Sequence, residues 1–188
     1  DIQPEGLLSG LNTQVNFFQT VVKNQIGGVV VGFGPFTLQN QNIGRIRSRG
    51  IELINEYWLD DTWRLDFGYT YTDAKIRANL DEPGLVGNRV EGAPEHFVSA
   101  GLRYQSGAFS AQLRGRYTSE QFQDASNETR LADAFVADAY LGYQFDEHWN
   151  LFVNVENLFD NTYTANAFGG VNRIGAPFQI LGGVTWRL

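Results

Sequence analysis

Apolar and polar residues alternate one by one along much of the chain. In the segment 63–73, apolar and aromatic residues occupy every second position from Trp63 to Tyr71, and Arg, Asp, Gly and Thr fill the positions between them. Because successive side chains of a β-strand point to opposite faces, this period of two predicts a strand with one apolar and one polar face. Similar alternation, less regular in the first two segments and broken at Phe152, predicts eight strands at about residues 11–21, 51–59, 63–73, 96–104, 109–118, 135–145, 149–156 and 178–188.

The connections between the predicted strands alternate in length. Three of them are short and rich in turn-forming residues, at 60–62, 106–108 and 146–148. The others are long, at 26–42, 77–95, 121–134 and 158–177. Outer-membrane barrels have short periplasmic turns and longer extracellular loops, so the alternation predicts the orientation of the strands. The last strand then descends from an extracellular loop, and we expect Leu188 at the periplasmic rim.

Aromatic residues on the predicted apolar face gather at two levels. The level beside the short turns comprises Tyr57, Trp63, Tyr104, Phe109, Tyr143, Phe145, Trp149 and Trp186, and the level beside the long loops comprises Tyr71, Tyr117, Phe135 and Phe178. Trp63 and Tyr71 are eight positions apart, which is about 26 Å along a strand and roughly 20 Å along the membrane normal at ~40° tilt. Soluble β-sandwiches and lipocalin-like barrels also alternate, but two aromatic levels at this spacing favour a transmembrane barrel.

The predicted polar face carries charges of both signs. Its lumen-facing candidates are Arg64, Asp66, Arg103, Arg114, Arg116, Asp138 and Glu156, followed by Arg187 in the last strand. Since unpaired charge is costly against lipid, we expect this face to line an aqueous or plugged lumen.

Composition excludes several other classes of protein. The net charge is -7 and no cluster of Lys and Arg is present, so we expect no nucleic-acid partner. The chain has no Cys, which removes disulfides and Cys-ligated metals. No run of roughly 20 apolar residues predicts a transmembrane helix. A mean hydropathy of -0.27 suits barrel strands, whose two faces average out.

Single polar residues do not predict enzymatic chemistry. The two histidines, His96 and His148, lie at opposite ends of the predicted barrel, so we expect no catalytic, metal or cofactor-binding site. The cluster of Glu156, Asn157 and Asp160 has no accompanying His or Cys, which favours a structural role. Arg47 and Arg49 lie on the side of Ile51 near the outer end of their strand, which favours interface anchoring or contact with lipopolysaccharide phosphate over substrate binding. An outer-membrane hydrolase or acyltransferase would need a nucleophile beside a base, a pairing that these histidines do not favour.

Several spaced motifs resemble those of one family. The segment 154–163, with Glu156-Asn157-Leu158-Phe159-Asp160 followed by Tyr163, resembles the Glu-Asn-Leu-Phe-Asp segment at the penultimate strand of TonB-dependent outer-membrane receptors. Residues 40–52, 87–89 and 93–96 are similar to that family's Gln-Asn-x-Gly with Arg-Gly-x-Glu, Gly-Asn-Arg and Pro-x-His segments. The ending, with Gly183, Trp186 and Leu188, resembles the C-terminal β-signal, although Leu188 replaces the more usual Phe.

The resemblance implies a fold and a function. It implies an all-β, antiparallel, up-and-down transmembrane β-barrel of 22 strands with an N-terminal plug, of which residues 1–188 would be the last eight strands. It also implies active uptake of a siderophore, haem, cobalamin or similar scarce nutrient across the bacterial outer membrane. On this reading the plug, the TonB box and the earlier strands are missing, and Asp1, which follows no initiator Met or signal peptide, is expected to be preceded by further chain.

Partners and candidate ligand contacts follow from the same resemblance. The expected partners are outer-membrane lipid and lipopolysaccharide, the TonB complex through the missing N-terminal region, the barrel assembly machinery through the C-terminal strand, and a small-molecule nutrient. In the final long loop, Tyr163, Phe168 and Arg173 could meet an anionic, ring-bearing ligand such as an iron chelate, and packing of the loop explains them equally well. The alternative is a complete eight-stranded barrel acting as a porin, adhesin or structural anchor.

Overall fold

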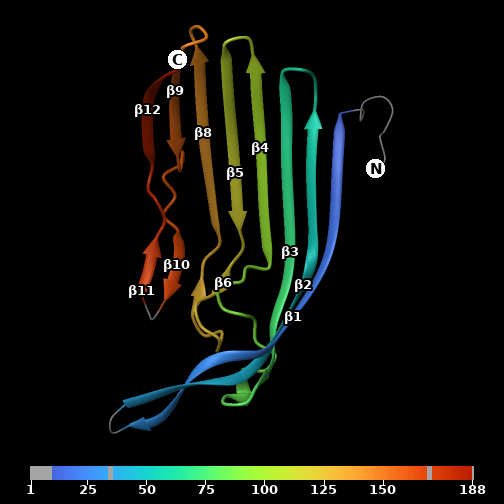
Figure 1. Cartoon of the computed structure of the whole chain (residues 1–188), viewed down its shortest axis with the longest axis vertical. Coiled ribbons are helices and arrows are strands. Elements are labelled where there is room, and N and C mark those ends of the chain that lie inside the picture. Colours follow the sequence, from blue (N-terminus) through green and yellow to red (C-terminus); the bar gives the residue numbers. More distant parts are fainter. Residues whose placement is uncertain (1–9, 34–35, 169–170, 188) are drawn as a thin grey trace.

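The computed structural model describes residues 10–33, 36–168 and 171–187, in which eight strands form one large antiparallel sheet (Figure 1). Its strand order is β1-β2-β3-β4-β5-β8-β9-β12. Strands that follow one another along the chain are therefore neighbours in the sheet, which is an antiparallel meander. The strands are β1 (Leu11–Phe33), β2 (Phe36–Trp58), β3 (Trp63–Asn79), β4 (His96–Ser106), β5 (Phe109–Thr118), β8 (Ala134–Gln144), β9 (Trp149–Glu156) and β12 (Gln179–Trp186). The sequence-based prediction of eight antiparallel strands is confirmed.

Smaller elements lie in the long connections. A 3-10 helix, η1 (Pro83–Leu85), follows β3, a short hairpin of β6 (Gln121–Phe122) and β7 (Arg130–Leu131) follows β5, and a second hairpin of β10 (Thr164–Phe168) and β11 (Val171–Ile174) precedes β12. No helix among the described residues is long and apolar enough to cross a membrane.

The pairing register places the alternating apolar residues on one face of the sheet. Leu102 on β4 lies opposite Leu113 on β5, which in turn lies opposite Ala139 on β8. This face is open rather than packed, since Leu113 and Leu141 are 48% and 50% exposed. Hydrophobic residues that are buried in the described structure are few: Ala74, Ile76, Phe122, Leu131, Val136 and Ala137. A soluble sandwich would cover such a face with a second layer, so this sheet has the surface of a protein that meets an apolar solvent.

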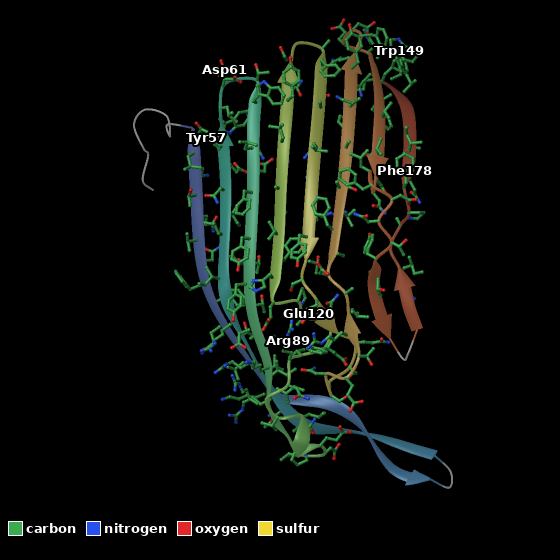
Figure 2. All side chains as sticks on the ribbon, turned by 180° about the vertical axis from the view of Figure 1, so that it is seen from behind. Tyr57, Asp61, Arg89, Glu120, Trp149 and Phe178 are labelled. Atoms are coloured by element: carbon green, nitrogen blue, oxygen red, sulfur yellow. The ribbon has the colours of Figure 1, made fainter. Side chains whose placement is uncertain are left out.

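Aspartates close two of the short turns. Asp60 Oδ1 accepts hydrogen bonds from the backbone N–H groups of Thr62 (2.7 Å) and Trp63 (2.8 Å). Asp146 Oδ1 accepts the equivalent pair from His148 (2.8 Å) and Trp149 (2.9 Å). An Asp carboxylate that accepts hydrogen bonds from the backbone N–H groups two and three residues later stabilises a tight turn. In both turns the next strand begins at a Trp. Figure 2 shows Asp61 and Trp149 together at this end of the sheet.

The first long connection is shorter than the sequence predicts. Residues 26–42 were expected to form a loop, but β1 and β2 continue to pair as far as Phe33 and Phe36. Their register shifts between Lys23 and Gln25, where Asn24 has a φ of 56°. An antiparallel hairpin is held by its backbone hydrogen bonds, so these residues pair without an alternating apolar pattern. Similarly, β3 extends past the predicted end at Asp73 to Asn79.

Candidate functional site

Charged residues on the face opposite the apolar one form a network across β2, β3 and β4. Arg64 and Arg103 lie directly opposite each other in the register, an arrangement that repels unless it is neutralised. Asp66 neutralises it, since its carboxylate lies 2.7 Å from Arg64 Nη2 and 3.0 Å from Arg103 Nε. Glu56 adds a second carboxylate 3.3 Å from Arg64. These groups therefore share one face of the sheet. The expectation that this face lines a lumen remains a prediction.

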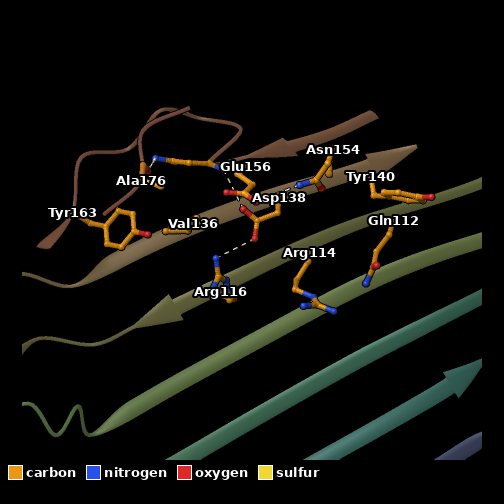
Figure 3. A pocket seen from close by; sticks show the side chains of 12 residues that line it. Gln112, Arg114, Arg116, Val136, Asp138, Tyr140, Asn154, Glu156, Tyr163 and Ala176 are labelled. Carbon is orange, nitrogen blue, oxygen red and sulfur yellow. Dashed lines mark hydrogen bonds and ion pairs between the residues drawn. The ribbon is translucent and has the colours of Figure 1, made fainter. Parts of the chain in front are cut away.

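A second charged group surrounds a hollow at the end of the same face (Figure 3). The hollow has a volume of about 340 Å³ and is lined by residues that include Gln112, Arg114, Arg116, Asp138, Glu156 and Tyr163. Arg116 Nη2 donates to Asp138 Oδ2 at 3.1 Å, whereas Arg114 forms no ion pair among the described residues. The hollow can therefore offer a guanidinium to a ligand or to another protein segment.

The hollow has the chemistry of a binding surface. The described residues contain no group of three or more His, Asp or Glu side chains placed to hold a metal. His96 and His148 are absent from its lining, so no imidazole lies there to act as a base. The available groups are guanidinium, carboxylate, amide and phenol, which suit recognition of a polar, charged partner.

The three residues of the final loop that were predicted to contact a ligand lie in different places. Tyr163 lines the hollow, and its ring lies over Gly175, where an added Cβ would approach it to 2.0 Å. Arg173 is exposed on β11 and does not line the hollow. Phe168 belongs to β10, but its side chain lies outside the described part of the structure. Gln112, Tyr140 and Asn154 line the hollow and were not predicted, although period two places them on the same face as Arg114.

The Glu-Asn-Leu-Phe-Asp segment forms a tight junction at the edge of the hollow. Asn157 is 2% exposed and has a φ of 50°. Its side-chain Nδ2 donates to the carbonyl oxygens of Asn161 (2.9 Å) and Ala176 (3.0 Å), and its Oδ1 accepts from the N–H of Asn161 (3.0 Å). Asp160 Oδ1 accepts from the N–H of Phe178 at 2.9 Å. The segment thus joins the end of β9 to the residues that lead into β12.

The remaining members of this segment attach it to β8. The N–H of Leu158 donates to the carbonyl oxygen of Ala137 at 2.7 Å, and the ring of Phe159 stacks on Phe135 with centroids 6.2 Å apart. The N–H of Asn157 donates to Asp138 Oδ1 at 3.1 Å. Because Asp138 also binds Arg116, the junction holds one wall of the hollow in place.

The Gly-Asn-Arg segment connects two of the long loops. Asn88 Nδ2 donates to the carbonyl oxygens of Ala125 (2.9 Å) and Ser126 (3.1 Å). Arg89 and Asn127 exchange two bonds, from Arg89 N to Asn127 Oδ1 (2.8 Å) and from Asn127 Nδ2 to Arg89 O (3.0 Å). Gly87, with a φ of 103°, supplies the turn that presents them. The loop after β3 and the β6–β7 hairpin therefore behave as one unit.

Asp124 organises the tip of the β6–β7 hairpin. The Ser126 hydroxyl, and then the backbone N–H groups of Glu128 and Thr129, hold the pKa of Asp124 well below its ordinary value of 3.8. These bonds favour the ionised carboxylate, so the tip is most ordered when Asp124 is charged.

The last strand carries the residues of the expected β-signal. Trp186 pairs with Trp149, with ring centroids 6.3 Å apart, and a Cβ at Gly183 would approach the Phe152 ring to 2.5 Å. Gly183 therefore makes room for the one aromatic residue that breaks the alternation of β9. Leu188 lies outside the described residues.

Comparison with known proteins agrees with this geometry. A family model described as "TonB dependent receptor-like, beta-barrel" matches residues 5–158. The chain is 33% identical over 157 residues to the ferrioxamine B receptor of Salmonella typhimurium (strain SL1344), covering 78% of the chain and 22% of that relative. It is 29% identical over 154 residues to the ferrichrome outer membrane transporter/phage receptor of Escherichia coli (strain K12), covering 77% and 20%.

A solved structure shares the fold. The siderophore receptor PiuA from Acinetobacter baumannii superposes with a TM-score of 0.80 at 21% identity, over 95% of this chain and 26% of that one. The chain thus spans about a fifth of the length of the two sequence relatives, with 22% and 20% coverage.

Proposed function

The chain belongs to the TonB-dependent receptor-like β-barrel family, and from this membership we propose that it forms part of the wall of a receptor that takes up a scarce nutrient with energy from the TonB complex. The family is one of outer-membrane receptors and transporters. The observation that carries the proposal is the sheet itself: one exposed apolar face, one face with paired charges, and long loops gathered at one end (Figure 1). Such surfaces suit a barrel wall between lipid and an aqueous lumen and so support the proposal.

The proposed substrate class is a ferric siderophore. The names of the relatives support it, since one is a receptor for ferrioxamine B and the other a transporter of ferrichrome. Tyr163 and Arg114 at the hollow add a phenol and a guanidinium, which suit an oxygen-rich chelate of iron. Haem and cobalamin are the other nutrients that the family resemblance implies.

The proposed place of the chain is the C-terminal portion of the barrel. In this arrangement the short turns and the end of β12 are periplasmic, the charged face meets the lumen and plug, and the last strand is read by the barrel assembly machinery. Among the described strands, β1 and β12 form separate edges of the sheet. Two unpaired edges favour a section of a larger barrel over a complete eight-stranded one, because a closed barrel has none.

Uptake by cells that express the full-length gene tests the function. Cells lacking their own siderophore receptors should accumulate radioactive iron presented as a hydroxamate chelate, and deletion of TonB should abolish the accumulation. As a matched pair, Arg114→Ala should lower uptake, whereas Arg130→Ala, which removes an exposed loop cation, should not. Accumulation that persists without TonB, or passive permeability to unrelated small solutes, would instead indicate a pore.

A further inference from the structure

The hollow on the charged face contains one ion pair and two charged side chains that have no ionic partner. Arg116 and Asp138 form the pair, with Nη2 and Oδ2 3.1 Å apart. Arg114 and Glu156 form no ion pair among the described residues, and both side chains are exposed. Because Arg116 and Asp138 neutralise each other, the hollow offers one positive and one negative group to whatever enters it.

The strand register keeps these two single charges apart. Arg114 on β5 lies directly opposite Asp138 on β8, yet Asp138 binds Arg116, which is two residues further along β5. The register of β8 and β9 places Glu156 beside Asp138 on its other side. Two strand spacings, about 10 Å, therefore separate the backbones at Arg114 and Glu156. Figure 3 shows Asp138 between Glu156 and the two arginines, so a ligand that meets both single charges must span Asp138.

Neighbouring hydrogen bonds hold the two carboxylates in this arrangement. Asp138 Oδ1 accepts from the N–H of Asn157 at 3.1 Å while Oδ2 binds Arg116, so both of its oxygens are occupied. Glu156 Oε1 accepts from Asn154 Nδ2 at 3.3 Å, and its Oε2 has no partner among the described residues. The free oxygen of Glu156 is thus an acceptor for a donor that comes from outside the sheet.

A ligand of a single sign does not match this hollow. An anionic ligand that binds Arg114 would be repelled by the carboxylates of Asp138 and Glu156, and a simple cation would be repelled by the guanidinium groups. The uncharged polar groups of the lining are amides and phenols, from Gln112, Asn154, Tyr140 and Tyr163. A volume of about 340 Å³ is small for a ligand site, so it suits one arm of a chelate and the oxygen atoms next to it.

We propose that the transported chelate carries an alkylammonium arm that binds Glu156, while Arg114 binds the electron-rich oxygen atoms of the chelate centre. The inference rests on the proposed function, because it names the charge of the substrate that this receptor takes up. An ammonium group forms a charge-assisted hydrogen bond with a carboxylate, and a guanidinium forms one with oxygens that carry negative charge. Glu156 then determines specificity for the arm, and Asp138 is a positioning residue that keeps Arg116 from neutralising Glu156.

Equilibrium binding by the purified full-length receptor tests the proposal. The probes are three ferric complexes of one linear trihydroxamate whose terminal amine is free, acetylated or succinylated. The wild type should bind the amine form about tenfold or more tightly than the acetylated form, as expected for one charge-assisted bond, and the succinylated form least tightly. E156Q, which keeps an acceptor for Asn154 but loses the charge, should bind the amine and acetylated forms alike. E128Q, which removes an exposed carboxylate of the β6–β7 hairpin, should keep the full preference.

A second variant separates the two roles, and the outcomes separate the two proposals. R114Q should weaken binding of all three complexes by a similar factor, because Arg114 contacts the centre that they share. Equal affinity of the wild type for the amine and acetylated forms would overturn the inference, and so would an unchanged ratio in a folded E156Q protein with normal heat-modifiable mobility. Neither result would alter TonB-dependent iron uptake, so the transport proposal would stand. A receptor that binds none of the complexes would overturn the inference as well, and the uptake assay would then decide whether the transport proposal fails with it.

Discussion

Replacement of Asn157 by Ala should loosen the junction between β9 and β12. The substitution removes three side-chain hydrogen bonds from a site that is 2% exposed, leaving the N–H of Asn161 and two carbonyl oxygens without their partner. Leaving a buried polar group unsatisfied costs about 1 to 3 kcal/mol, and partial hydration of the opened site reduces the sum. The left-handed backbone at Asn157 adds about 1 kcal/mol, because Ala tolerates it less well than Asn. We expect a local destabilisation of about 2 to 4 kcal/mol.

Hydrogen exchange in the full-length receptor measures this loss at a defined atom. The amide of Asn161, which donates to Asn157, should exchange roughly 30-fold to 1000-fold faster in the variant, since each 1.4 kcal/mol is about a factor of ten. Asn154→Ala is the matched control: its side chain makes one exposed hydrogen bond, to Glu156 at 3.3 Å, and its loss should change exchange less than about threefold. Unchanged exchange at Asn161 in N157A would refute the role of this side chain.

Three further predictions follow from other parts of the sheet. Gly50→Val should destabilise the β1–β3 region by about 1 to 3 kcal/mol, seen as faster exchange there, because its Cβ would lie 1.9 Å from a β3 carbonyl oxygen and 2.6 Å from the Phe18 ring. Leu113→Arg should weaken refolding into bilayers by about 2 to 4 kcal/mol while Gln112→Arg, on the opposite face, is tolerated; equal effects would contradict the two faces. The stability that Asp124 contributes is complete above its ordinary pKa of 3.8 and is lost as the pH falls below that value. Pepsin should therefore cut the β6–β7 hairpin little at pH ~4 and increasingly toward pH ~2. The D124N variant should be cut equally at both pH values.

The faces of the central strands could be predicted from the sequence because the two sides of the sheet differ in chemistry. Along β5, successive side chains point alternately to the apolar face and to the charged face, so apolar and polar residues alternate one by one from Phe109 to Tyr117. The exception at Phe152 has a local cause, since Gly183 opposite leaves space for its ring and Tyr140 stacks on it at 6.5 Å. A single sequence does not show that two distant residues compensate in this way.

At the long-loop end of the sheet the alternation is not kept, and the predictions were correspondingly weaker. Residues 26–33 pair with residues 36–42 through their backbones, and no alternation of apolar and polar residues in the sequence predicts this pairing. The bonds between Asn88 and Ala125, and between Arg89 and Asn127, join segments 37 and 38 residues apart that only the fold brings together. The Arg47–Asp73 pair was likewise unpredicted, because strand register decides which charges meet. The charged face that includes Arg114 was predicted, but the hollow on that face was not.

The two faces of β5 can be tested directly in the full-length receptor. The chain has no Cys, so single cysteines placed in turn at positions 109–118 of this segment can carry a spin label. Accessibility to oxygen, which concentrates in lipid, should peak at odd positions, and accessibility to a water-soluble nickel complex should peak at even positions. Alternation in this phase would place the apolar face in the membrane and the charged face on an aqueous lumen. Uniform accessibility along the strand, or alternation in the opposite phase, would contradict the assignment of this chain to a receptor wall.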